Sequence, residues 1–338
     1  MELIDRIDAT SATPKYLQVV NAVIADIEAG ILKLGERVPS INETSEMYYL
    51  SRDTIEKAYK VLRKRGVISS VKGKGCFISK TFCADKIRVL LLFNKLSAYK
   101  KTVYYSILQT LGEDAIVDLH IHHFDGKICE DLIQESLGKY HYYVIMPHFS
   151  TNVEAANQVI RKIPEEKLLL LDKNIETYQG NCAAVYQDFE RDIRSALHSG
   201  KDLLQKYNKF VLVYPKEVAY PIEIVKGFRQ FCRDTAMAHT VVSNIQEEPP
   251  LAGTAYIVLE ESDLADLIQE TRANGMALGE DIGLISYNDT PLKKLLDNGI
   301  TVISTNHEQM GETAGYLMKH KLQEKVHNPF TLIRRSSL

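Results

Sequence analysis

The segment SRDTIEKAYKVLRKRGVISSVKGKGCFISK, residues 51–80, decides how the N-terminal part of the chain folds. Its apolar residues are spaced by three and four positions, as on one face of a helix: Ile55, Ala58, Tyr59 and Leu62. Ser51 is a preferred N-cap residue, and Gly66 ends the pattern. Two extended runs follow, VISSV and CFISK, joined by KGKG at 72–75, whose glycines permit the positive φ angles of a tight hairpin. We therefore expect a helix followed by a basic β-hairpin.

Two further helices are predicted before this segment. Residues 15–29 repeat apolar side chains at helical spacing and are followed by Gly30. Ser40, with Glu43 three residues later, forms a capping-box pattern, which predicts a short second helix that begins at Ser40. Three helices and a hairpin make a winged helix-turn-helix, in which the third helix enters the DNA major groove and the hairpin, or wing, approaches phosphates. A small dimerisation module with the same elements is the alternative.

Positive charge is concentrated in this module. The chain of 338 residues has a formal net charge of -3, whereas residues 1–80 carry a net charge of +3. Within residues 52–80, nine Lys and Arg side chains stand against two Asp and Glu. Such a local excess favours contact with nucleic-acid phosphates, although a solvated helix face is the alternative explanation of a charged run.

The N-terminal module resembles the winged-helix DNA-binding domain of the GntR family. The resemblance rests on PKY at 14–16, GILKLGERVPSINE at 30–43, LSRDT at 50–54, AYKVL at 58–62 and GKGCF at 73–77. It implies DNA contacts from helix N-termini and from the wing. The residues expected to make them are Ser40, Ser51, Arg52, Asp53, Thr54, Lys57, Lys72, Gly73, Lys74 and Gly75.

Arg52 is the first candidate for a direct base contact, because its guanidinium can pair bidentately with guanine or with a phosphate. An ion pair with Asp53 or Glu56 is the alternative for Arg52. Asn42 and Glu56 stand where GntR proteins often have basic residues, so we expect an operator that differs from familiar ones.

After a short linker at 81–85, apolar runs alternate with amphipathic stretches from residue 86 to the end of the sequence. This alternation predicts a doubly wound α/β fold, because continuous apolar runs are typical of buried parallel strands. The expected strands are 87–93, 117–124, 142–146, 168–171, 209–214, 238–242, 254–259, 282–287 and 300–304. The expected helices are roughly 99–111, 129–138, 151–161, 189–206, 221–234, 262–274 and 307–322.

The same part of the chain resembles the effector domain of the lactose-repressor (LacI) family. DIGLISYNDTPL at 281–292 and GITVISTN at 299–306 carry the resemblance, with LLD at 170–172 and VYQD at 185–188 in agreement. The resemblance implies a periplasmic-binding-protein type I architecture, in which three crossovers join two α/β lobes and a small ligand binds between them. Lobe 1 is expected at about 86–207 and 300–321, and lobe 2 at about 208–299 and 322–338.

Polar and aromatic residues stand at the expected strand ends, where ligands bind in such folds. The candidate ligand-binding residues are Asn94, His148, Phe149, Asp172, Asp188, Phe189, Tyr214, Glu260, Asn288 and Asp289. An aromatic ring that stacks on a sugar, beside groups that accept its hydroxyl hydrogens, suits this set. Asp188 and Asp289 could instead cap the following helices, and Tyr214 could belong to the core.

The identity of the effector cannot be inferred from the resemblance to the family. LacI-type sugar binders commonly have Arg, Asn and Asp where this chain has Ile224, Glu260 and Asn288. Related GntR–LacI hybrids serve pentose and deoxysugar use, so a monosaccharide of the L-arabinose or L-fucose type is the working hypothesis.

Composition excludes several other classes. There is no run of about 18 apolar residues, and the first residues, MELIDRIDATSATPK, are too acidic and polar for a signal peptide, so we expect a cytoplasmic protein that does not enter a membrane. The five cysteines contain no C-x-x-C pair and are expected to be reduced. His120, His122 and His123 could suggest a metal, but only the first two would share a face of a strand, so no metal is expected.

The sequence therefore predicts a homodimeric transcription regulator that binds an inverted-repeat operator and responds to a small effector. One alternative is a DNA-binding protein whose C-terminal fold only dimerises. Another is a regulator with an aminotransferase-like domain that uses pyridoxal phosphate, but the remainder is short for that fold and no lysine has a convincing Schiff-base context. We expect no cofactor and no enzymatic activity, since the sequence contains no P-loop, dinucleotide fingerprint, nucleophile elbow or H-E-x-x-H motif.

Overall fold

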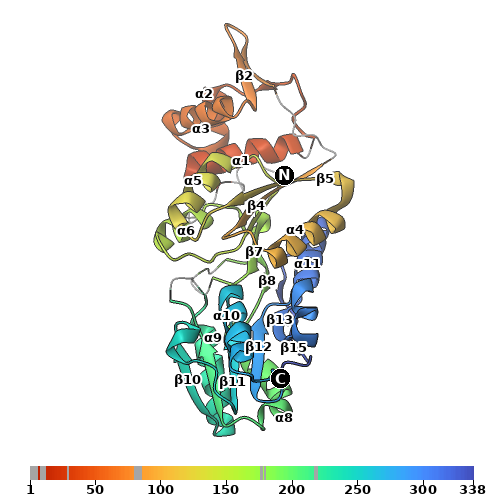
Figure 1. Cartoon of the computed structure of the whole chain (residues 1–338). Helices are drawn as coiled ribbons and strands as arrows, with labels where there is room; N and C mark the ends of the chain where they lie inside the picture. The colour runs from red at the N-terminus through yellow and green to blue at the C-terminus, as the bar shows by residue number, and fades with distance from the viewer. Residues whose placement is uncertain are drawn as a thin grey trace. The chain divides into compact units, whose positions relative to one another are not determined.

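The computed structural model describes residues 7, 13–28, 30–79, 86–175, 178, 180–216 and 220–338 (Figure 1). The chain forms two compact units. Unit 1 comprises Met1–Leu92, Gly112–Val144 and Thr151–Leu168, and unit 2 comprises Phe93–Leu111, Ile145–Ser150 and Leu169–Leu338. The expected linker at 81–85, which contains Cys83, lies outside the described residues.

The N-terminal part of unit 1 is a winged helix-turn-helix, as expected. Its elements are α1 (Lys15–Glu28), β1 (Arg37–Val38), α2 (Ile41–Tyr48), α3 (Arg52–Lys64), β2 (Ile68–Val71) and β3 (Gly75–Ile78). The strands form an antiparallel sheet of order β1-β3-β2, in which β1 was not predicted because two residues carry no periodic signal. The predicted apolar face of α3 is buried against α1, and Tyr59 donates a hydrogen bond of 2.6 Å to the Pro39 carbonyl.

The rest of the chain is α/β. In the described residues, one six-stranded sheet has the order β14-β8-β7-β6-β4-β5 and the other β10-β9-β11-β12-β13-β15. The strands of the first are β4 (Ile87–Phe93), β5 (Ala115–Ile121), β6 (Tyr142–Ile145), β7 (Leu168–Asp172), β8 (Ala183–Tyr186) and β14 (Lys325–His327). The strands of the second are β9 (Lys209–Val213), β10 (Ala238–Val242), β11 (Thr254–Val258), β12 (Ile282–Tyr287), β13 (Thr301–Thr305) and β15 (Phe330–Ile333).

The remaining helices follow the predicted alternation. They are α4 (Ala98–Leu111), α5 (Gly126–Ser136), α6 (Val153–Ile160), α7 (Phe189–Ser199), α8 (Lys201–Leu204), α9 (Glu223–Thr235), α10 (Glu261–Ala273) and α11 (His307–His320). Short 3-10 helices span Gly112–Asp114, Glu165–Lys167, Ile245–Glu247, Pro291–Lys294 and Leu296–Asn298.

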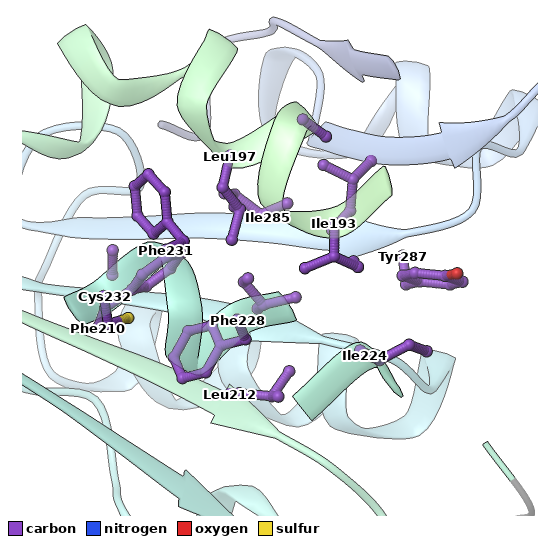
Figure 2. Close-up of a cluster of buried hydrophobic side chains, with 14 of the residues drawn as sticks. Ile193, Leu197, Phe210, Leu212, Ile224, Phe228, Phe231, Cys232, Ile285 and Tyr287 are labelled. Atoms are coloured by element: carbon purple, nitrogen blue, oxygen red, sulfur yellow. The ribbon is translucent and has the colours of Figure 1, made fainter. Parts of the chain in front are cut away.

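A large apolar core of unit 2 lies between the second sheet and helices α7 and α9 (Figure 2). Ile193 and Leu197 of α7 face Phe228 and Phe231 of α9, over Phe210 of β9. The two helices approach closely because Gly227 has no side chain, since a Cβ there would lie 2.3 Å from the Glu190 carbonyl oxygen. This packing anchors the start of α7, which carries two of the predicted ligand residues.

Some predicted boundaries were wrong. The strand expected at 117–124 ends at Ile121, and His123 and Phe124 have positive φ angles. The helix expected at 189–206 breaks at Gly200, whose Cβ position would lie 2.7 Å from the Leu332 side chain. Strands β14 and β15 were not predicted, because they are short and β15 lies at a sheet edge with alternating exposure.

The sheet pairings correct the expected lobes in part. The segment 300–321 was expected in lobe 1, and its helix α11 does pack on α4, but its strand β13 pairs with β12 in the second sheet. The segment 322–338 was expected in lobe 2, and its strand β15 does pair with β13 in the second sheet, but its strand β14 pairs with β8 in the first sheet. An apolar run marks a strand, whereas its partner strand is chosen by the three-dimensional path of the chain, so the run alone could not assign these segments.

Candidate DNA-binding surface and effector site

The N-terminus of α3 presents exposed polar side chains. The Ser51 hydroxyl accepts a hydrogen bond of 3.3 Å from the Thr54 N–H, which is the predicted cap. Arg52 and Asp53 are exposed, and among the described residues Arg52 forms no ion pair with Asp53 or Glu56. Glu56 instead pairs with Lys60 at 3.2 Å. The guanidinium of Arg52 therefore remains available to a partner outside the chain.

Other predicted DNA contacts differ in availability. Ser40 and Glu43 form the predicted capping box, in which the Glu43 carboxylate accepts the Ser40 N–H at 2.5 Å. This backbone hydrogen bond lowers the pKa of Glu43. The ammonium group of Lys57 lies over the ring of Tyr16, 4.2 Å from its centre, and makes a cation–π contact inside the module. Lys57 is therefore less available to DNA than a lysine without such a contact.

The wing is exposed throughout its turn. Lys72, Gly73, Lys74 and Gly75 join β2 to β3 and all four are exposed. Gly73 and Gly75 have φ angles of 76° and 105°, which a residue with a Cβ rarely adopts. The glycines thus make the turn that holds both lysines in solvent.

In unit 2, the ends of β4, β6 and β7 hold a buried polar network. His148 Nε2 lies 2.9 Å from Asp172 Oδ2, and Gln187 Nε2 donates a hydrogen bond to the other carboxylate oxygen of Asp172. Lys100 of α4 is 4% exposed and donates to Asn94 Oδ1 and, at 3.2 Å, to Met146 Sδ. Burial lowers the pKa of Lys100 to about 8. Lys100 and Gln187 were not predicted. Lys100 lies within α4, whereas Gln187 directly follows β8, next to the predicted residue Asp188.

The charge state of Asp172 follows from this network. Burial alone would raise its pKa, but the hydrogen bond from His148 and the nearby Lys100 outweigh burial and hold the pKa well below its usual range. Asp172 also has a φ of 73°, a left-handed backbone that Asp tolerates better than most residues. The carboxylate is thus a charged acceptor in a fixed orientation.

A second cluster surrounds Glu260. Its Oε1 accepts a hydrogen bond of 2.7 Å from the Tyr220 hydroxyl and lies 3.5 Å from Lys95 Nζ. Lys95 Nζ is 5.6 Å from the centre of the Tyr220 ring. Burial, above all, raises the pKa of Tyr220. This places an aromatic ring beside a carboxylate, the combination expected for a sugar site, but with Tyr220 as the ring.

The third cluster contains Asn288 and Asp289. Lys293 Nζ donates to the carbonyls of Tyr287 and Asn288 at 2.9 Å each, and Asn288 has a φ of 62°. Asp289 does not cap the following helix but pairs with Arg335 at 2.7 Å.

A cavity of about 360 Å³ adjoins this third cluster, and Asp289 is the one predicted ligand residue among the side chains that line it. Tyr99 and His307 stack on its wall with ring centres 4.9 Å apart. Burial lowers the pKa of His307 to about 4, while the charges of Asp172, Lys100 and Asp289 also act on it. His307 and Tyr99 were not predicted, because neither stands at a predicted strand end.

The other predicted ligand residues are mainly structural. Asp188 caps α7 by accepting the Arg191 N–H at 3.2 Å, and Phe189 is buried in the core, 6.1 Å from the His148 ring. Tyr214 packs against the same core and donates to the Tyr220 carbonyl at 2.6 Å. Phe149 is half-buried beside His148.

The histidine run and the cysteines carry no metal centre in the described residues, where no group of three His, Cys, Asp or Glu side chains is placed to hold an ion. His120 is exposed and His122 is buried, so they do not share a face as expected, because β5 ends at Ile121. Cys76, Cys129 and Cys232 are free thiols. None of the described helices has the length and apolar character to cross a bilayer.

Comparison with known proteins agrees with both parts of the fold. Residues 15–78 match the family "Bacterial regulatory proteins, gntR family", and residues 203–338 match "Periplasmic binding protein-like domain". The chain is 35% identical over 103 residues to the HTH-type transcriptional repressor YtrA of Bacillus subtilis, covering 30% of this chain and 75% of that protein. It is 20% identical over 369 residues to the arabinose metabolism transcriptional repressor of Geobacillus stearothermophilus, covering 96% and 98%.

Solved structures share the fold of the C-terminal part. A LacI family transcriptional regulator from Enterococcus faecium with bound ribose superposes with a TM-score of 0.59 at 18% identity, covering 74% of this chain and 98% of that one. The trehalose repressor from Escherichia coli gives a TM-score of 0.59 at 16% identity, covering 74% and 100%. The winged helix and the periplasmic-binding-protein-like fold define a DNA-binding transcriptional regulator. The chain belongs to the GntR family of bacterial regulatory proteins, with a LacI-like C-terminal domain.

Proposed function

We propose that this regulator binds an inverted-repeat DNA operator as a homodimer and that a neutral monosaccharide bound in unit 2 changes its operator affinity. The observation that supports the sugar most directly is the network in which His148 and Gln187 orient the half-buried carboxylate of Asp172. A carboxylate oxygen accepts more than one hydrogen bond, so Asp172 can still accept from ligand hydroxyls. Few, well-placed polar groups at the ends of buried strands are typical of small-molecule sites.

The charges in unit 2 favour a neutral ligand. Lys100 lies near Asp172, and Lys95 lies against Glu260, so each carboxylate has a cationic neighbour. An anionic ligand would leave one carboxylate facing another negative charge, whereas sugar hydroxyls can donate to both carboxylates and accept from the lysines. Tyr220 offers a ring for stacking beside Glu260. One relative is named for arabinose metabolism and one similar structure holds ribose, so L-arabinose, L-fucose and D-ribose are the first sugars to test.

Coupling to DNA requires a segment that can differ between bound and free states. The crossover at 305–307 is tied to that at 327–330 by hydrogen bonds from the Asn328 side-chain amide to Thr305 and to the Asn306 carbonyl, at 2.7 Å and 2.9 Å. We propose that sugar binding repositions these crossovers. A ligand shifts such an equilibrium only by its differential affinity, typically about 1–3 kcal/mol.

Calorimetric titration of the full chain with the three sugars tests this proposal, together with binding to an operator selected from random DNA. Glu260→Ala should bind operator without sugar within about threefold of the wild type, because Glu260 is not in the DNA-binding module, yet lose the sugar response. If no sugar binds and none alters operator affinity, the alternative holds in which the C-terminal domain only dimerises.

We propose a homodimer because one recognition helix contacts too few base pairs for sequence-selective binding, whereas two helices contact twice as many. Footprinting should show two related half-sites, and a monomer that protects one asymmetric half-site would contradict the proposal. Action on chromosomal DNA makes the cytoplasm the proposed location. We propose no enzymatic activity, and a pyridoxal absorbance band in the purified protein would contradict that.

A further inference from the structure

Tyr49 occupies a backbone conformation that disfavours its own side chain. It ends α2 as the C-cap residue with φ 49° and ψ 40°, in the left-handed region. A Cβ makes this region unfavourable, and glycine is the usual residue at such helix ends. The turn itself is held by other groups, since the Leu50 N–H donates to the Ser45 carbonyl and the Ser45 hydroxyl donates to the Leu50 carbonyl at 2.6 Å. Glycine at position 49 would therefore make the same turn.

The side chain of Tyr49 brings no compensating contact within the chain. It is 80% exposed, and among the described residues its ring and hydroxyl form no hydrogen bond or ring contact. The preceding tyrosine shows the contrast, because Tyr48 is 8% exposed and belongs to the core of the winged helix. Tyr49 thus combines a strained backbone with an aromatic ring that stabilises nothing in the module. A strained backbone that also holds an exposed, unpartnered aromatic ring suggests a contact outside the chain.

The position of Tyr49 indicates which function. Two residues later Ser51 caps α3, and Arg52 and Asp53 follow at the exposed end of that helix. Adjacent Cα atoms are about 3.8 Å apart, so the backbone of Tyr49 lies within about 7.6 Å of that of Ser51. The N-terminal end of the recognition helix, here α3, is the part of a helix-turn-helix that contacts DNA bases. A tyrosine hydroxyl often donates a hydrogen bond to a backbone phosphate.

We propose that Tyr49 contacts the operator by donating its hydroxyl hydrogen to a phosphate beside the bases that α3 reads. This inference rests on the proposed operator binding. It adds Tyr49 to the DNA contacts expected from the resemblance to the GntR family. Because the phenol is uncharged, its contact releases no counterion, in contrast to the contacts of the wing lysines. A phosphate contact also carries no base preference.

The test uses the full chain and fluorescence anisotropy with selected operator and with unrelated duplex DNA, across a salt series. Tyr49→Phe removes only the hydroxyl and should weaken binding to both DNAs by about tenfold, the equivalent of a hydrogen bond to a charged group, with an unchanged salt slope. Tyr49→Gly should weaken binding at least as much, while the midpoint of thermal unfolding stays equal or rises, because the strain is removed.

Ala236→Gly is the matched control. Ala236 is also a left-handed helix C-cap, with φ 54°, but at the end of α9 in unit 2. It should leave DNA affinity unchanged. Wild-type affinity in both Tyr49 variants would overturn the proposal, as would a Tyr49→Gly protein that unfolds at a lower temperature or sediments as a monomer. Failure of the wild type to bind any DNA would instead overturn the proposed operator binding itself.

Discussion

The exposed N-terminal end of α3 and the strand-end network of unit 2 are both polar, but they are built in opposite ways. Arg52 is exposed and forms no ion pair within the described residues, whereas Asp172 is half-buried and both of its oxygens accept hydrogen bonds. Exposed cations suit a polyanion, whose charge attracts them at long range. A buried network suits a small ligand, because desolvated groups are oriented before binding. Exposed, unpaired side chains therefore characterise the first kind of site, and side chains held in a fixed orientation characterise the second.

The largest effect is expected from Asp172→Ala. The substitution removes the acceptor proposed for sugar hydroxyls and leaves His148 and Gln187 without their partner, so sugar affinity should fall at least about 100-fold and unfolding should become easier by about 1–3 kcal/mol. Calorimetry and urea denaturation measure the two effects. Asp188→Asn is the control, because Asp188 only caps α7 and Asn is an equally good cap. Equal sugar binding by both variants would place the site elsewhere.

Arg52→Ala tests the role of the exposed N-terminal end of α3 in DNA binding. Loss of a bidentate contact should cost about 1–3 kcal/mol on the operator and relax base preference at one position of each half-site. Lys57→Ala is the control, since Lys57 already lies over Tyr16 and should contribute less. Operator titrations of both proteins check the difference. A larger loss for Lys57→Ala than for Arg52→Ala would reverse the assignment.

The two buried lysines Lys100 and Lys293 should make the free energy of unfolding depend on pH in a range where exposed lysines have no effect. Burial lowers the pKa of each to about 8, whereas an unfolded lysine has a pKa of about 10.4. Between these values the unfolded state binds more protons, so the free energy of unfolding rises with pH from about 8, by at most about 1.4 kcal/mol per pH unit for each lysine. Below about pH 8 both states are protonated and this dependence vanishes.

Urea denaturation between about pH 7.5 and 9.5, below the ionisation of unfolded tyrosine near 10, measures that rise. Lys100→Met should flatten it in part. The exposed neighbour Lys101→Met is the control and should leave the slope unchanged. Identical slopes in all three proteins would mean that Lys100 is not buried in solution.

The smallest effect at moderate salt is expected from Lys72→Ala combined with Lys74→Ala. These exposed wing lysines release counterions from phosphates, so the double variant should weaken binding to operator and unrelated DNA alike and reduce the salt slope by about one to two. Titrations from about 50 to about 300 mM salt supply the slope. An unchanged salt slope would show that the wing lysines do not contact DNA phosphates.

Much of the structure around the proposed DNA-binding surface could be predicted because its signals are local. The caps at Ser40 and Ser51 and the wing glycines depend on neighbours within a few residues, and the structure has each where it was expected. The proposed effector site could be predicted only in part. Asp172, His148 and Asn94 do belong to one network region, but Lys100 reaches it from α4 and Gln187 from beyond β8, which no spacing rule connects.

The amino-acid sequence by itself determined the winged helix, the α/β alternation and the residues at most strand ends, because periodicity and capping act over one or two turns of chain. Tertiary structure decided which strands pair, as with β13 and β14, since pairing depends on chain paths over long separations. It also decided the role of each strand-end residue. Asp188 and Asp172 both stand at the end of a strand, yet Asp188 is exposed and caps a helix whereas Asp172 is a half-buried acceptor, because only packing sets which partners and how much water surround a carboxylate.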